Sequence, residues 1–288
     1  MKYLIFLGCV IPYRVQSYEI SARRVLSELG VELEEMPTYN CCGFPIEAVS
    51  YEARILLAAR NLAIADEVGL DIITLCPGCS ETLYHTLLEL KEDEELRNTV
   101  NEQLGEIGLE FKGKIGVKHI ARVLLEDVGV EKIKDKVVNP LEKVKVAQHS
   151  GCHIARPVKI MQFEDPENPT ALKRLIEATG ATCLSYEDEA QCCGGPVSGI
   201  DPDIPTRLVG DKLRRVRDVG AHALITVCPY CHLMYEGTQP MVERKLGEKF
   251  GIPVLHYPQL LGLAMGLSPE ELAVNMLRVK ATKLLELV

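Results

Sequence analysis

Short apolar runs alternate with longer segments of helical spacing throughout the chain. In its first part, apolar runs at 3–7 and 71–75 predict buried strands, and 31–36 alternates apolar with acidic residues, as a half-exposed strand does. Segments 17–29 and 50–68 have helical spacing, and each is followed by a glycine suited to end a helix. Strands that alternate with helices of these lengths predict parallel sheets built from βαβ units.

The second part of the chain repeats this order of elements. The predicted strands there are 145–149, 182–186 and 223–227, and the predicted helices are 170–179 and 203–219. Residues 66–77 also parallel 217–229, and a fourth strand with its helix recurs at 115–122 and 252–259. We infer a duplication.

The predicted fold class is therefore α/β, with two duplicated open parallel-sheet (Rossmann-like) halves and a C-terminal helix. We expect the halves to span 1–135 and 144–288, because the stretch 132–143 is polar and contains a proline. The last helix is expected after Leu267, beginning at Ser268-Pro269-Glu270-Glu271, which is a good capping sequence.

The composition and the charge of the chain argue against two classes of function, nucleic-acid binding and membrane insertion. A net charge of −9 argues against nucleic-acid binding, which needs a basic face. The apolar run at 3–7 is too short for a signal peptide, and no run is long enough to insert into a membrane. We expect a cytoplasmic protein whose thiols stay reduced.

Ten of the eleven cysteines form two sets with the same design. Each set has one upstream cysteine, then Cys-Cys-Gly, then Cys-Pro-x-Cys. The first set is Cys9, Cys41, Cys42, Cys76 and Cys79, and the second is Cys152, Cys192, Cys193, Cys228 and Cys231. Each cysteine follows a predicted strand or opens the next helix, so the five thiols of a set should converge beyond the carboxyl ends of the strands. Cys183 lies inside a predicted strand and is interpreted as a buried thiol.

Five thiols per set favour a polynuclear iron-sulfur centre. A zinc site and a cubane iron-sulfur cluster each take four ligands, and adjacent cysteines point apart in an extended chain. Three other interpretations remain open from the residues alone: a zinc-stabilised interaction module, disulfides, and a thioredoxin-like redox motif at Cys-Pro-x-Cys. The chain has no glycine-rich dinucleotide fingerprint, so no bound NAD or FAD is expected.

The doubled motif resembles the cysteine-rich CCG domain family, and two copies without a fused ferredoxin domain resemble the B subunits of archaeal heterodisulfide reductases. The resemblance implies two noncubane [4Fe-4S] clusters, one on each cysteine set, and reduction of the mixed disulfide of coenzyme M and coenzyme B. It also implies three partners, namely a ferredoxin-like C subunit, a flavin- and iron-sulfur-containing A subunit, and a hydrogenase or formate dehydrogenase.

Other side chains near the motifs are candidates for substrate contacts. Because the implied disulfide is anionic and small, Arg14 and Arg156, which follow Cys9 and Cys152 at similar spacing, are predicted to bind it. His149, His153 and His232 flank the cysteines, and His153 is the candidate proton donor. We interpret the charged residues Lys212, Arg214, Arg215 and Arg217 as a solvated helix face or a partner contact.

Two clusters that face one substrate fit the transfer of two electrons in single steps. We therefore expect the disulfide to lie between the halves. The alternative function is a non-catalytic electron-relay subunit of another oxidoreductase of this family, of the thiol:fumarate reductase or glycolate oxidase type. That alternative predicts no cavity between the halves.

Overall fold

The structure is a computed structural model that describes all residues from 1 to 288. Its first half builds a four-stranded sheet with the order β2-β1-β3-β4, in which all neighbours are parallel. The elements of this half are β1 (Lys2–Phe6), α1 (Ile11–Arg14), α2 (Gln16–Glu28), β2 (Glu32–Glu35), η1 (Phe44–Ile46), α3 (Tyr51–Val68), β3 (Ile72–Thr74), α4 (Pro77–Glu92), α5 (Glu94–Gly105), β4 (Val117–His119) and α6 (Ile120–Arg122).

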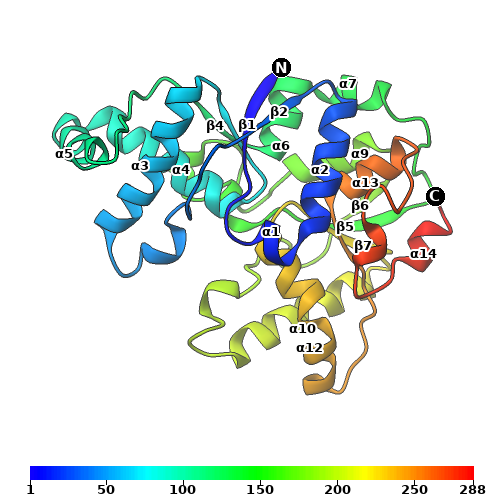
Figure 1. Cartoon of the computed structure of the whole chain (residues 1–288). Coiled ribbons are helices and arrows are strands. Elements are labelled where there is room, and N and C mark those ends of the chain that lie inside the picture. Colours follow the sequence, from blue (N-terminus) through cyan, green and yellow to red (C-terminus); the bar gives the residue numbers. More distant parts are fainter.

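The second half repeats the topology with the order β6-β5-β7-β8, again entirely parallel. A connection formed by η2 (Val123–Val128) and α7 (Val130–Asp135) leads into it. Its elements are β5 (Lys145–His149), η3 (Cys152–Ile154), α8 (Val158–Met161), α9 (Ala171–Ala178), β6 (Thr182–Leu184), η4 (Gly195–Val197), α10 (Asp203–Asp218), β7 (Ala223–Thr226), α11 (Pro229–His232), η5 (Leu233–Gly237), α12 (Gln239–Leu246), β8 (Val254–His256) and α13 (Tyr257–Ala264). The predicted α/β class with two duplicated parallel sheets is confirmed (Figure 1).

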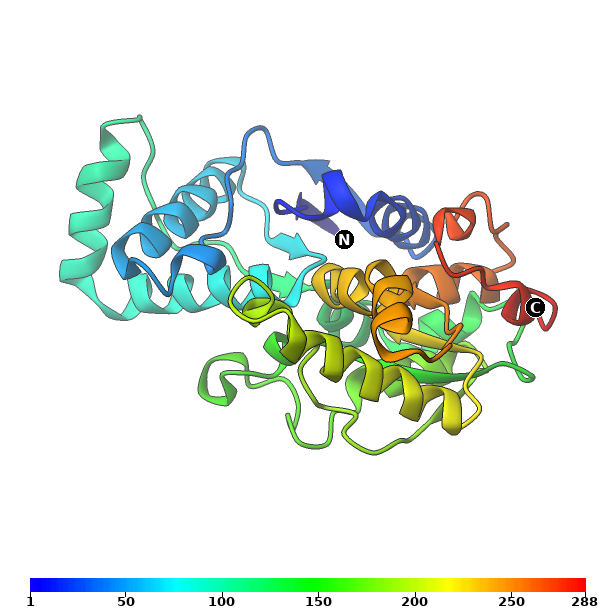
Figure 2. The ribbon, with the colours of Figure 1, turned by 90° about the horizontal axis from the view of Figure 1, so that it is seen from below.

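The two sheets share one central layer of side chains. A core of 44 buried residues takes one face of each sheet together with side chains of α2, α9 and α13. The opposite faces pack separately, against α3, α4 and α5 in the first half and against α10 and α12 in the second. Figure 2 shows α5 at the end of the molecule farthest from the C-terminus, with α10 crossing the second half. Both faces of the central strands β1, β3, β5 and β7 are thus buried, which explains their continuous apolar character, whereas the edge strand β2 keeps its glutamates partly exposed.

The end of the chain differs from the prediction. A turn begins at Ser268 with the two bonds of a capping box: the Glu271 amide donates to the Ser268 hydroxyl oxygen, and the Ser268 amide donates to the Glu271 carboxylate. No continuous helix follows. Ala273 has a φ of 52°, which ends the turn, and the chain continues as η6 (Val274–Met276) and α14 (Thr282–Leu285). The physical reason is tertiary: the Gln259 side chain donates to the Leu272 carbonyl, so this segment is fixed against α13.

None of the helices combines the length and the apolar character that a membrane span requires.

Candidate metal centre

Each cysteine set gathers at the carboxyl ends of its parallel strands. Cys9 follows β1, Cys41 and Cys42 follow β2, and Cys76 follows β3 as the N-cap of α4. The second half places its cysteines in the same way after β5, β6 and β7, with Cys228 as the N-cap of α11. The structure therefore brings together the five thiols of each predicted set.

Within each half the thiols form a continuous series of contacts. In the first half the thiol of Cys41 lies next to those of Cys9 and Cys42, and the thiol of Cys79 lies next to those of Cys42 and Cys76. The second half repeats this order with Cys152, Cys192, Cys193, Cys231 and Cys228, and the Sγ atoms of Cys231 and Cys193 are 3.6 Å apart. All eleven cysteines are free thiols, so no disulfide is formed.

The two series meet at one point. Cys76 and Cys228, the first cysteines of the two Cys-Pro-x-Cys motifs, are neighbours across the boundary between the halves, close enough for each thiol to influence the pKa of the other. The ten cysteines thus form one uninterrupted row of sulfur atoms. This link was not predicted from the sequence.

The first thiols of the two Cys-Cys pairs have equivalent electrostatics. Hydrogen bonds from Cys42 and then Cys9 lower the pKa of Cys41 to about 2, and hydrogen bonds from Cys152 and then Cys193 lower the pKa of Cys192 to about 2. Burial raises the pKa of Cys183, outside both sets, to about 12. The first residue of each Cys-Cys pair is therefore favoured as a thiolate, the form that binds metal.

The donor set fits a polynuclear cluster better than a single ion. No three His, Cys, Asp or Glu side chains are grouped as ligands of one metal ion. The thiols lie instead in an extended row of five, which suits several metal atoms. Both ring nitrogens of His149 and Nδ1 of His232, next to this row, are buried without a hydrogen-bond partner. Such groups suit hydrogen bonds to the sulfur of a cluster.

An exchange of aromatic residues distinguishes the two halves. In the first half the ring of Phe44, after Cys-Cys-Gly, lies over Gly78 of Cys-Pro-Gly-Cys. In the second half the ring comes from Tyr230 of Cys-Pro-Tyr-Cys and lies over Gly195. Each half thus places one aromatic ring beside its cysteines. The ring comes from the segment after Cys-Cys-Gly in the first half and from the Cys-Pro-x-Cys motif in the second half.

The candidate proton donor His153 reaches from the second half to the first. Its ring packs edge-on against Phe44, with ring centres 4.8 Å apart, and its Nδ1 lies 3.8 Å from the Glu81 carboxylate on α4. The other two flanking histidines are buried, and burial lowers the pKa values of both His149 and His232 to about 3. These two are neutral at physiological pH, whereas His153 is partly exposed at the boundary.

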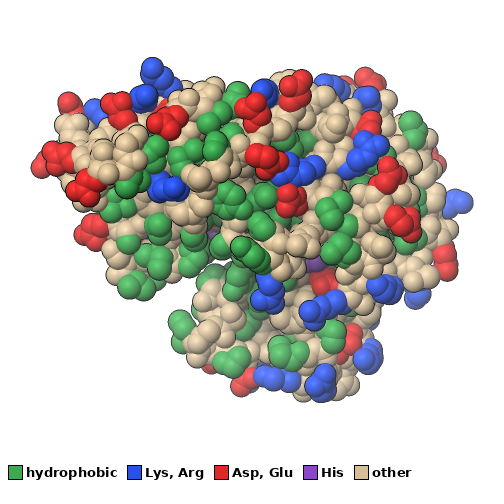
Figure 3. All heavy atoms as spheres, viewed as in Figure 1, with side chains coloured by type: hydrophobic (Ala, Val, Ile, Leu, Met, Phe, Trp, Pro, Cys, Tyr) green, Lys and Arg blue, Asp and Glu red, His purple; other side chains and the backbone are tan.

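The two predicted substrate arginines line different cavities. Arg14 lines a cavity of about 410 Å³ formed by both halves, with Tyr230 and His232 from one side and Val10 from the other. Arg156 lines a cavity of about 530 Å³ that includes Cys192, and its guanidinium pairs with Glu167 at 2.6 Å. The structure does not bring Arg14 and Arg156 into one cavity. Figure 3 shows a hollow on the surface between the part that carries α3 and α4 and the part that carries α10.

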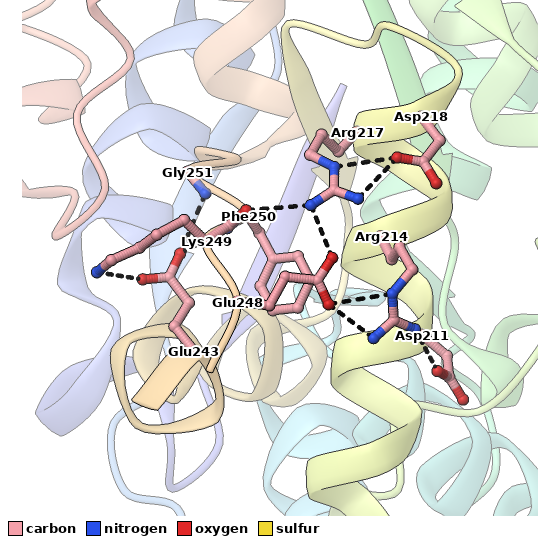
Figure 4. Close-up of polar contacts among 9 residues, drawn as sticks. All are labelled: Asp211, Arg214, Arg217, Asp218, Glu243, Glu248, Lys249, Phe250 and Gly251. Carbon is pink, nitrogen blue, oxygen red and sulfur yellow. Dashed lines mark hydrogen bonds and ion pairs between the residues drawn. The ribbon is translucent and has the colours of Figure 1, made fainter. Parts of the chain in front are cut away.

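The charged residues of α10 do not form a single solvated face, and this corrects the sequence interpretation for Lys212. Arg214 and Arg217 lie on the surface and pair with the two oxygens of Glu248, each at 2.8 Å (Figure 4). Lys212 is fully buried, and its Nζ donates to the carbonyl oxygens of Asp188 and Glu189. The spacing in the sequence indicates why Lys212 is buried: it lies on the same helical stripe as Val209 and Val216, which face the core.

The contact between the halves involves residues that sequence reasoning missed. Tyr18 on α2 donates its hydroxyl to the Val227 carbonyl at 3.0 Å, and its ring stacks on His256 at 3.8 Å. His119, the counterpart of His256 at the end of the fourth strand, contacts the same carbonyl through Nε2 at 3.1 Å. These contacts fix the strand that leads into Cys228. No local pattern predicts them, because they join segments 108 or more residues apart.

A fold and site of this kind define a cysteine-rich domain protein, and comparison with known proteins agrees. The family model described as "Cysteine-rich domain" (CCG) matches residues 3–84 and 146–236, so the chain belongs to the CCG family. The matched segments contain all ten cysteines of the two sets.

Two curated relatives match along most of their length. The chain is 37% identical to the B subunit of the ferredoxin/F420H2-dependent CoB-CoM heterodisulfide reductase of Methanosarcina acetivorans, over 95% of this chain and 92% of that protein. It is 31% identical to the 8-methylmenaquinol:fumarate reductase membrane anchor subunit of Wolinella succinogenes, over 98% and 99% of the two chains. A crystal structure of a hypothetical protein from Helicobacter pylori shares the fold, with a TM-score of 0.78 at 17% identity over 97% of this chain and 52% of that one.

Proposed function

We propose that this chain is the disulfide-reducing subunit of a heterodisulfide reductase. In this proposal it holds two noncubane [4Fe-4S] clusters, and it reduces the mixed disulfide of coenzyme M and coenzyme B to two thiols. The observation that carries the proposal is the single row of ten thiols, joined between the halves at Cys76 and Cys228. The similarity to heterodisulfide reductase B subunits over 95% of the chain supports the choice of substrate.

The reaction needs two electrons and two protons for each S–S bond that breaks. Bound clusters supply the electrons one at a time. Cys9, Cys41, Cys42, Cys76 and Cys79 would hold one cluster, and Cys152, Cys192, Cys193, Cys228 and Cys231 the other. Because the two sets meet at Cys76 and Cys228, both electrons would be available within one small region of the protein.

The cavity of about 410 Å³ suits the substrate because both halves line it. Its position between the halves also favours the disulfide-reducing function over the relay alternative, which predicts no such cavity. Arg14 forms no ion pair with this chain's carboxylates, so its guanidinium is available to an anionic group of the substrate. Arg278 lies at the same cavity and adds a second cation. His153 does not line this cavity. It is proposed to deliver a proton to a departing thiolate because it lies at the boundary between the halves, beside Cys152.

Electrons must come from other proteins in this proposal. A ferredoxin-like C subunit would deliver them, and a flavin-containing A subunit would receive them first from a hydrogenase or formate dehydrogenase. The names of relatives support an assembly of several proteins, since two of them are named as the B subunits of their reductases.

A second candidate function is supported by the relative from Wolinella succinogenes. That protein is named as a subunit of a fumarate reductase, at 31% identity over nearly the whole chain. The chain would then be an electron-relay subunit, whose clusters pass electrons without acting on a disulfide.

One experiment separates the two functions. The protein is purified without oxygen, its iron is counted, and its turnover of the mixed disulfide with reduced viologen is measured. The proposed function predicts about eight iron atoms per chain and disulfide turnover. Cys41→Ser should lose about half of the iron, while Cys183→Ser, outside both sets, should keep all of it. Full iron content without any disulfide turnover would favour the relay function, and a colourless protein that holds zinc would contradict both.

A further inference from the structure

The two halves differ in charge at one buried position. Helices α3 and α10 correspond with an offset of 151 residues, so that Gly43 packs on Arg54 as Gly194 packs on Pro205. At this offset Asn61 corresponds to Lys212. Both side chains are fully buried.

Asn61 and Lys212 have the same structural task. The Asn61 amide nitrogen donates to the carbonyl oxygens of Asn40 and Cys41 at 3.3 and 3.4 Å, and thus fixes the chain that enters the first Cys-Cys pair. Lys212 Nζ donates to the carbonyl oxygens of Asp188 and Glu189 at 2.5 and 2.9 Å, and thus fixes the chain that enters the second pair. This position therefore carries a neutral amide, Asn61, in the first half and a cation, Lys212, in the second half.

The charge of Lys212 is not cancelled by a direct ion pair. No carboxylate oxygen lies within the 4.0 Å that defines an ion pair with its Nζ. The nearby Asp188 carboxylate is engaged by Arg215 at 2.9 Å, and Glu189 is engaged by Gln148. The other buried cation of the chain, Arg54 in the first half, is paired with Glu89 at 2.7 Å. The second half therefore contains a buried positive charge that no carboxylate pairs with directly, while the carboxylates of Glu189 and Asp188 act on it from a greater distance.

This charge acts on the second cysteine set. Lys212 interacts electrostatically with the carboxylates of Glu189 and Asp188 and also with the thiol of Cys231. Its Nζ lies 5.0 Å from the Tyr186 ring centre, which covers it on that side. Burial lowers the pKa of Lys212 to about 8, so it remains largely protonated at pH 7. A cation in a medium of low polarity stabilises the more negative, reduced form of a nearby cluster and raises its reduction potential.

We propose that Lys212 is a positioning residue that gives the centre in the second half a higher reduction potential than the centre in the first half. A single electron that enters the pair would then reside on the second half, and the next electron would remain on the first. This inference rests on the part of the proposed function in which each cysteine set holds a redox cluster, and it does not depend on the identity of the disulfide.

The test is an anaerobic redox titration of the intact protein, followed by electron paramagnetic resonance. In Lys212→Asn, which copies the first half, the higher midpoint potential should fall toward the lower one. Lys212→Arg keeps the charge and should keep the separation. Arg217→Gln is the matched control, because it removes one positive charge from the same helix at an exposed site, and it should leave both potentials unchanged.

A second measurement tests the inference even if Lys212→Asn fails to bind the cluster of the second half. Cys41→Ser removes the centre of the first half and leaves Lys212 intact. Its remaining cluster should titrate at the higher of the two wild-type potentials, and titration at the lower potential would overturn the inference. Midpoint potentials that stay unchanged in a Lys212→Asn protein with both clusters bound would also overturn the inference. Disulfide turnover is measured on the same samples. If the two midpoint potentials differ as predicted but no disulfide is turned over, the proposed function is contradicted and this inference is not.

Discussion

Cys76 and Cys228 are neighbours at the boundary of the two halves, and each is the N-cap of the helix that carries the rest of its Cys-Pro-x-Cys motif. Gly151 allows this proximity. A Cβ atom at Gly151 would lie 3.1 Å from the Cβ of Cys228 and 3.3 Å from the Cγ of Pro77. The backbone of one half thus fits between the cysteine motifs of both.

Gly151→Ala should separate the two cysteine sets. The added methyl group presses on both motifs, and the φ of +84° at Gly151 is unfavourable for alanine by about 1 kcal/mol. We expect a loss of folding stability of about 2 to 4 kcal/mol in urea unfolding, with a weaker magnetic interaction between the two centres.

Gly220→Ala is the control for this change. Its φ of +78° is similar, but nothing lies within 4 Å of the added methyl group. It should therefore show only the backbone cost of about 1 kcal/mol and an unchanged spectrum. Equal losses in the two variants would show that Gly151 does not hold the motifs together.

The exchange of aromatic residues between the halves gives a second prediction. A Cβ atom at Gly195 would lie 2.3 Å from the Tyr230 ring, so Gly195→Ala must displace that ring, which lines the cavity of about 410 Å³. We expect a higher KM for the disulfide, by roughly three- to tenfold for a loss of about 1 kcal/mol of binding, with iron content unchanged.

A double-mutant cycle tests the cause. Tyr230→Ala removes the clash, so Gly195→Ala should have little further effect in its presence. Gly199→Ala, where the new methyl group meets nothing, should leave KM unchanged. Additive effects of the first two substitutions would refute a role for the ring.

The third prediction concerns His153. If it delivers a proton to the departing thiolate, His153→Gln should lower kcat for disulfide reduction by at least about tenfold, with full iron content and little change in KM. The loss should diminish when a disulfide with a more acidic thiol as leaving group is used, since that thiolate needs no proton to depart. His85→Gln, on the same carboxylate Glu81 but away from the cysteines, should retain kcat. A loss of kcat that is the same for every leaving group would instead indicate a packing role against Phe44.

Much of this architecture was accessible from the sequence, because its signals are local. Apolar runs identify buried strands, and a cysteine at the end of such a run must lie at the carboxyl edge of a parallel sheet. The gathering of Cys9 with Cys41 follows from that rule alone. The proximity of Cys76 and Cys228 does not follow from that rule. It depends on the packing of α2 against α13, two helices far apart in the sequence, which local patterns do not predict.

The errors have equally physical causes. The capping sequence at Ser268 does form its local hydrogen bonds, but contacts to α13 determine the path of the chain after Leu272. Lys212 was interpreted by its charge, although its position on a stripe with Val209 and Val216 places it inside. A lysine on a buried stripe is better interpreted as a functional or anchoring residue, since burial of its charge is costly without such a role.

The last prediction concerns stability against pH and depends on His222, which is remote from both cysteine sets. The Lys145 amide donates to His222 Nδ1 at 3.0 Å, which requires an unprotonated Nδ1. Burial, followed by the positive charges of Lys145 and Lys283, lowers the pKa of His222 below its ordinary value of 6.5. The unfolded chain therefore binds a proton more readily than the folded chain.

The contribution of His222 to folding stability should accordingly be complete above pH 6.5 and decline as the pH falls below that value toward the lowered pKa of the folded state. The buried His149 and His232, whose pKa values are lowered as well, add to the decline of the wild-type protein. Urea unfolding at pH 7.5, 6.5 and 5.5 measures this decline. His222→Asn keeps an acceptor for the Lys145 amide but cannot be protonated, so its stability should decline less over the same interval. Lys283→Gln removes one of the repelling charges and should give an intermediate slope. If His222→Asn and the wild-type protein lose stability in parallel, the decline must originate in another group.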